Sequence, residues 1–101
     1  MKKLLLITFR QSLEEDLGHL LQEIGVKNYT LITGVFGKGE TGKVAGSFGW
    51  PGLNSVLLVV LDEEQAIPVQ EKLKAFHNRL ATQQPSKIPL RLFVLPCDQI
   101  F

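Results

Sequence analysis

The order of apolar patterns along the chain limits its possible folds more than any other feature. Two segments repeat apolar residues at the three-to-four spacing of a helix, and four shorter segments are apolar runs or rich in β-branched residues, which favours strands. The patterns follow the order strand, helix, strand, strand, helix, strand. The expected strands cover residues 2–9, 28–36, 54–61 and 88–95.

The first helical pattern carries both a start and a stop signal. Ser12 and Glu15 form an S-x-x-E capping box, in which each side chain can accept a hydrogen bond from a free N–H of the first turn. Gly25 follows the last apolar position, where glycine commonly ends a helix. The sequence therefore predicts a capped helix that ends at Gly25.

The second helical pattern follows the third strand. Pro68 is best accommodated in a first turn, where its missing N–H costs no hydrogen bond, so the helix is expected to begin near Glu64 or Gln65. With this helix, the element order predicts one domain over residues 1–101. Its fold class is an α+β ferredoxin-like βαββαβ sandwich, a four-stranded antiparallel sheet with two helices on one face.

The uncovered face of such a sheet raises the question of assembly. Residues 56–61, VLLVVL, are apolar on both faces of their strand, whereas a half-covered sheet usually alternates apolar with polar. If about eight such side chains point to the open face, each is worth roughly 1.5–3 kcal/mol when buried. We expect another subunit to cover this face; the alternative is that the face tolerates some apolar exposure.

Charge and composition exclude several classes of function. Eleven basic and 10 acidic residues give a net charge of +1, which provides no broad electrostatic attraction to nucleic acid or anionic lipid. Cys97 is the sole cysteine, and His19 and His77 do not complete a zinc-binding spacing with it. We therefore expect no catalytic residues, no metal site, no nucleic-acid partner and no membrane insertion, in a cytoplasmic protein.

The connection between the second and third strands contains a glycine-rich heptad. Residues 37–43, GKGETGK, fit both G-x-G-x-x-G and G-x-x-x-x-G-K, two patterns whose backbone N–H groups bind phosphate. Val44 stands where the second pattern requires Ser or Thr, and the glycines and Pro51 that follow prevent the helix that both patterns need. A conventional nucleotide loop is therefore not favoured.

The same connection, residues 37–54, exceeds the roughly 12–15 residues beyond which a loop is usually functional or disordered. It also contains Phe48 and Trp50, and aromatic side chains often anchor protein partners. The sequence favours a partner-binding loop; the alternative is that the two aromatic side chains fold back against the domain.

Together, the topology, the long connection and the apolar sheet face resemble the PII-like signalling proteins. The stretch GVFGKGETG is similar to the point where the second strand of that family enters its T-loop, with Gly37 and Gly39 matching the family's G-x-G. Lys87 is similar to the lysine that ends the family's B-loop. The resemblance implies a homotrimer that binds an effector between subunits and, through the T-loop, regulates a partner such as a transporter or enzyme, without turnover.

The sequence differs from the family in its B-loop, where Pro85 and Ser86 replace glycines that wrap phosphates. Within the resemblance, the expected effector is an adenine nucleotide or a small anion such as bicarbonate, held by backbone N–H groups and lysines. The alternatives are a CutA-like metal-related trimer and a protein adaptor that binds no ligand. The candidate effector-binding residues are Gly37, Lys38, Gly39, Gly42, Lys43 and Lys87.

Overall fold

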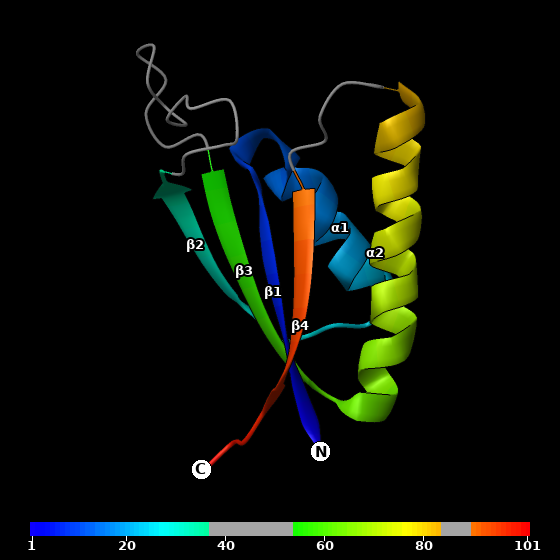
Figure 1. The fold of residues 1–101 in the computed structure, drawn as a ribbon. Helices are drawn as coiled ribbons and strands as arrows, with labels where there is room; N and C mark the ends of the chain where they lie inside the picture. The colour runs from blue at the N-terminus through cyan, green and yellow to red at the C-terminus, as the bar shows by residue number, and fades with distance from the viewer. Residues whose placement is uncertain (37–53, 84–89) are drawn as a thin grey trace.

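The computed structural model describes residues 1–36, 54–83 and 90–101, which form a sheet covered by helices on one face (Figure 1). The sheet is antiparallel with strand order β2-β3-β1-β4, so β2 and β4 are its edges. This arrangement confirms the ferredoxin-like sandwich. The elements are β1 (Lys2–Arg10), a 3-10 turn (Gln11–Leu13), α1 (Glu14–Glu23), β2 (Thr30–Val35), β3 (Asn54–Asp62), α2 (Glu63–Gln83) and β4 (Leu90–Cys97).

The start of α1 differs from the capping-box prediction. The helix begins at Glu14 with Leu13 as its N-cap residue, and no side chain caps it. The 3-10 turn between β1 and α1 includes Ser12 and moves the α-helix start past it. Glu14, Glu15 and Asp16 occupy the first helical turn, where negative charge interacts favourably with the helix dipole.

The predicted end of α1 is confirmed. Gly25 adopts φ +82°, a left-handed conformation that glycine enters without steric cost. Its N–H donates to the Gln22 carbonyl at 3.1 Å, and the Val26 N–H donates to the Leu21 carbonyl at 2.9 Å. These two bonds form a Schellman motif, which satisfies carbonyls that the helix end would leave free.

The prediction that Pro68 lies in the first turn of α2 is wrong. The helix begins at Glu63, so Pro68 lies beyond its first turn. The N–H of Glu63 donates to the Met1 carbonyl at 3.0 Å, and that of Asp62 donates to Gln65 Oε1 at 3.4 Å. The chain thus begins the helix directly after β3 with its donors engaged, and the proline costs a helical hydrogen bond within the helix.

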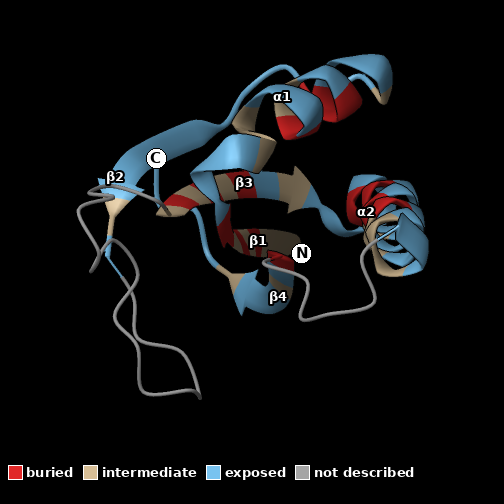
Figure 2. Ribbon diagram, turned by 90° about the horizontal axis from the view of Figure 1, so that it is seen from above, coloured by how far each residue is buried: buried red, intermediate tan, exposed pale blue. Residues whose placement is uncertain are grey.

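The hydrophobic core lies between the helices and one face of the sheet, and the buried parts of both helices face inward (Figure 2). Leu5 and Ile7 from β1 and Val59 from β3 are fully buried there. No helix in the described ranges has both the length and the apolar content to cross a membrane. The remaining core residues are Phe9, Leu17, Leu20, Leu21, Val26, Leu57, Ala66, Val69, Leu73, Phe76 and Leu90.

Candidate functional site

The two segments that carry the candidate site residues begin and end at one end of the molecule. In Figure 1, β2 ends and β3 begins at the same end of the sheet where α2 ends and β4 begins, opposite both chain termini. The fold therefore brings together the ends of segments 37–53 and 84–89. The predicted residues themselves lie outside the described ranges: Gly37, Lys38, Gly39, Gly42, Lys43, Phe48, Trp50 and Lys87.

The base of the first segment is an irregular strand pair. Thr33 pairs with Ser55, and Val35 pairs with Asn54, with a register shift between the two pairs. Gly34 lies at this bulge with φ +71°, which a residue with a Cβ adopts only under strain. The sequence patterns predicted the strands but not the bulge that turns the end of β2.

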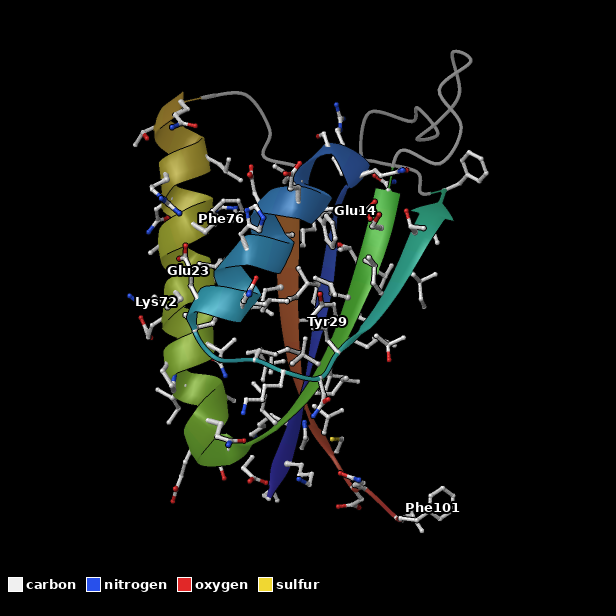
Figure 3. The ribbon with its side chains drawn as sticks, turned by 180° about the vertical axis from the view of Figure 1, so that it is seen from behind. Glu14, Glu23, Tyr29, Lys72, Phe76 and Phe101 are labelled. Atoms are coloured by element: carbon white, nitrogen blue, oxygen red, sulfur yellow. The ribbon has the colours of Figure 1, made fainter. Side chains whose placement is uncertain are left out.

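A polar cluster joins this strand pair to α1. Oε2 of Glu14 accepts hydrogen bonds from Thr33 Oγ1 and from Ser55 Oγ, each at 2.9 Å. Figure 3 shows Glu14 beside the end of β3 at the same end of the sheet. Sequence reasoning missed this cluster because Glu14 belongs to no local motif and its partners are 19 and 41 residues away.

The open face of the sheet carries a continuous apolar surface. Because Leu5, Ile7 and Phe9 face the helices, Leu4 and Leu6 face away, and the strand register aligns their neighbours with them. Several of these side chains are about half exposed. The surface, here called the sheet-face patch, consists of Leu4, Leu6, Ile32, Val56, Leu58, Val60, Phe93 and Leu95.

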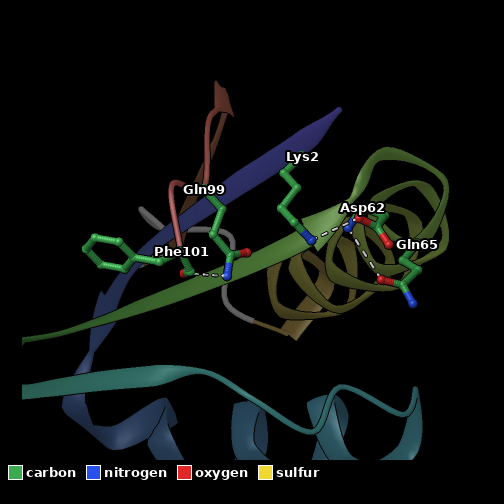
Figure 4. A network of polar contacts seen from close by, with 5 residues as sticks. All are labelled: Lys2, Asp62, Gln65, Gln99 and Phe101. Carbon is green, nitrogen blue, oxygen red and sulfur yellow. Dashed lines mark hydrogen bonds and ion pairs between the residues drawn. The ribbon is translucent and has the colours of Figure 1, made fainter.

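Polar rows bound the sheet-face patch at both ends of the strands. Lys2 and Asp62 pair across β1 and β3 with an Nζ to Oδ1 distance of 3.0 Å (Figure 4). At the other end, Thr8 pairs in register with Arg91 of β4. An apolar centre with a polar rim is typical of protein–protein interfaces.

A cavity of about 230 Å³ lies between α2 and the sheet. Its floor is apolar, and Lys74, His77 and Asn78 of α2 lie at its edge. His77 is half-buried, whereas His19 is exposed as expected. No carboxylate is among the described residues that line the cavity, so this part of the structure places no acid–base pair there.

Cys97, a free thiol at the end of β4, is half-buried. Within residues 1–36, 54–83 and 90–101, no group of three or more His, Cys, Asp or Glu side chains is placed to hold a metal ion. The geometry of the described residues thus directs attention to the loop base and the sheet-face patch.

Solved structures with this fold include PII-like proteins. CPII of Thiomonas intermedia K12, in a structure with ADP and bicarbonate, aligns with a TM-score of 0.69 and 24% identity over 93% of this chain and 83% of that chain. The apo form of CPII gives 0.64 and 22% over 93% and 86%. A Thermus thermophilus protein classed as PII-like signalling gives 0.61 and 24% over 93% and 84%. These likenesses place the chain in the PII-like structural class.

Sequence comparison identifies the family within that class. The model of the family described as nitrogen regulatory protein P-II matches residues 1–100. No curated protein matches the sequence at significant similarity. The chain belongs to the nitrogen regulatory protein P-II family, which confirms the resemblance inferred from the sequence.

Proposed function

We propose that this chain is a single-domain, cytoplasmic PII-like regulatory protein. It forms a homotrimer, binds an adenine nucleotide or small anion between subunits, and controls a partner protein through residues 37–54. The partner is a transporter or an enzyme, and the protein itself catalyses no reaction. The observation that carries the proposal is the common location of the ends of segments 37–53 and 84–89 at one end of the molecule.

Trimer formation is supported by the sheet-face patch. Four of its side chains, Ile32, Val60, Phe93 and Leu95, are 43–49% exposed in the single chain. Removing such apolar area from water favours association, with roughly 25 cal/mol per Å² buried. A closed symmetric assembly would cover the same patch on every subunit.

Effector binding is supported by residue chemistry and by the relatives. Gly37, Gly39 and Gly42 offer unobstructed backbone N–H groups, and Lys38, Lys43 and Lys87 supply positive charge. Structures of CPII contain ADP with bicarbonate, and ADP with AMP and acetate. We infer the same two classes of effector here: an adenine nucleotide and a small oxyanion.

Calorimetric titration tests this proposal directly. ADP and ATP are titrated into the purified protein with and without bicarbonate, and light scattering measures the mass in the same buffers. Fluorescence of Trp50, the sole tryptophan, reports whether the surroundings of the loop change on binding. We expect saturable binding to a trimer of 11.3 kDa chains, together with a fluorescence change.

Matched variants separate a specific site from general charge effects. Gly39→Ala and Lys87→Ala should weaken binding, whereas Lys72→Ala should not, because Lys72 lies on the outer side of α2 (Figure 3). A trimer that binds neither nucleotide nor anion contradicts effector binding and favours an adaptor. Binding of a divalent metal alone would instead favour the CutA-like alternative.

A further inference from the structure

The polar cluster of Glu14, Thr33 and Ser55 joins three elements through a single carboxylate oxygen. Both hydroxyl groups lie 2.9 Å from Oε2 of Glu14, and the two hydroxyl oxygens are 3.4 Å apart. Ser55 is fully buried, Glu14 is half-buried and Thr33 is exposed. The cluster therefore extends from the protein interior to its surface.

Donor accounting makes the carboxylate the centre of this cluster. Each hydroxyl has one proton, and a charged carboxylate accepts hydrogen bonds about twice as strong as neutral ones. When both protons point to Glu14, the 3.4 Å contact between the hydroxyl oxygens carries no proton. Without the carboxylate, Thr33 is the one remaining side-chain partner of Ser55 in the described part of the chain.

The position of the cluster relates it to segment 37–53. Thr33 and Ser55 face each other on β2 and β3, immediately before the bulge at Gly34. After the bulge, a single pair, Val35 with Asn54, completes the ladder. The ladder at this end is short and irregular, so the side-chain bonds to Glu14 supply a second restraint on both stems.

We propose that Glu14 is a positioning residue for effector binding: its carboxylate fixes the two stems of segment 37–53 relative to the first turn of α1. This inference rests on the proposed function, since it assigns Glu14 a role in the affinity of that same site. Restraint of the stems in the bound geometry raises affinity because less freedom is lost on binding. Glu14 acts through Thr33 and Ser55 and itself contacts no effector.

The test compares Glu14→Gln and Glu14→Ala with Glu15→Gln. Glu15 lies beside Glu14 in the first turn of α1 but is exposed, so its substitution makes the same change of charge outside the cluster. Thr33→Val and Ser55→Ala remove the donors while keeping similar shapes. Amide hydrogen exchange of residues 33–36 and 54–55 reports the stems without any ligand, and calorimetry reports ADP affinity.

We expect faster exchange of the stems in both Glu14 variants, and ADP binding weaker by about tenfold, the value of one charge-assisted bond. The effects of Glu14→Gln and Thr33→Val should be less than additive, because both remove the same bond. Glu15→Gln should behave as the unmodified protein does. Because Glu14→Gln keeps the shape of the side chain, it tests the proposal even if Glu14→Ala does not fold.

The outcomes distinguish this inference from the proposed function. Unchanged exchange of the stems in folded Glu14→Gln would overturn the positioning role. Faster exchange with unchanged ADP affinity would overturn the link to effector binding. Absence of ADP binding in the unmodified protein would contradict the nucleotide part of the proposed function and the link together, while the exchange measurement would still decide whether Glu14 positions the stems.

Discussion

Replacement of Phe93 by glutamate should dissociate the proposed trimer. Phe93 lies on the edge strand β4, and its register pairs it with Leu6 in the centre of the sheet-face patch. Its side chain is 49% exposed in the single chain. A glutamate there would place a charge where another subunit is expected to exclude water, and burial of an unpaired charge is strongly unfavourable.

The magnitude follows from the exposed area. Full burial of an aromatic side chain removes roughly 150–250 Å² from water, so about 100 Å² of Phe93 is left for a partner to cover. At about 25 cal/mol per Å², this area is worth about 2.5 kcal/mol for each contact. The loss corresponds to a roughly 70-fold weaker association at each contact, before the cost of burying the charge is added.

Sedimentation velocity over a range of protein concentrations measures the effect. The matched control is Ile67→Glu, which introduces the same charge at an exposed apolar residue of α2, on the helical side. We expect Phe93→Glu to shift the protein toward single chains and Ile67→Glu to keep the trimer. A Phe93→Glu trimer as stable as that of Ile67→Glu would refute the role of the sheet-face patch.

Three further predictions concern stability, measured by thermal unfolding at one fixed protein concentration because assembly makes the midpoint concentration-dependent. Gly18→Ala should stabilise the fold by about 0.5–1 kcal/mol, since Gly18 lies within α1 and an added Cβ meets no atom within 4 Å; a lower midpoint would contradict this. Gly25→Ala should destabilise by about 1 kcal/mol or more, because alanine at φ +82° is strained; an unchanged midpoint would show that the helix end relaxes. Leu5→Ala should cost about 2–5 kcal/mol, because Leu5 is fully buried between sheet and helices; a loss below about 1 kcal/mol would contradict its place in the core.

The fold could be read from the sequence where the patterns are local and periodic. The stripe of α2, Ala66, Val69, Leu73 and Phe76, is buried as its spacing indicates, and Leu80 is half-buried. The helix starts were less predictable. Ser12 lies in a 3-10 turn, and the N–H of Glu63 gains a hydrogen bond to the carbonyl of Met1, a residue far away in the sequence.

The candidate site was predictable in kind but not in geometry. The glycines and lysines of segments 37–53 and 84–89 are visible in the sequence because they form recognisable motifs. The cluster of Glu14, Thr33 and Ser55 is not visible, since no spacing rule relates residues that meet only when β2 and β3 pair beside α1. These residues remain candidates for positioning the site.

The sequence by itself determined the order of elements, the apolar character of both faces of the sheet, and the family to which the chain belongs. Short-range periodicity carries the information on the elements, because side-chain direction repeats every two residues in a strand and every 3.6 in a helix. Tertiary structure decided the strand register that assembles the sheet-face patch and the contact of one carboxylate with two strands. Both depend on residues far apart in the chain, whose proximity is set by how the whole sheet packs against its helices.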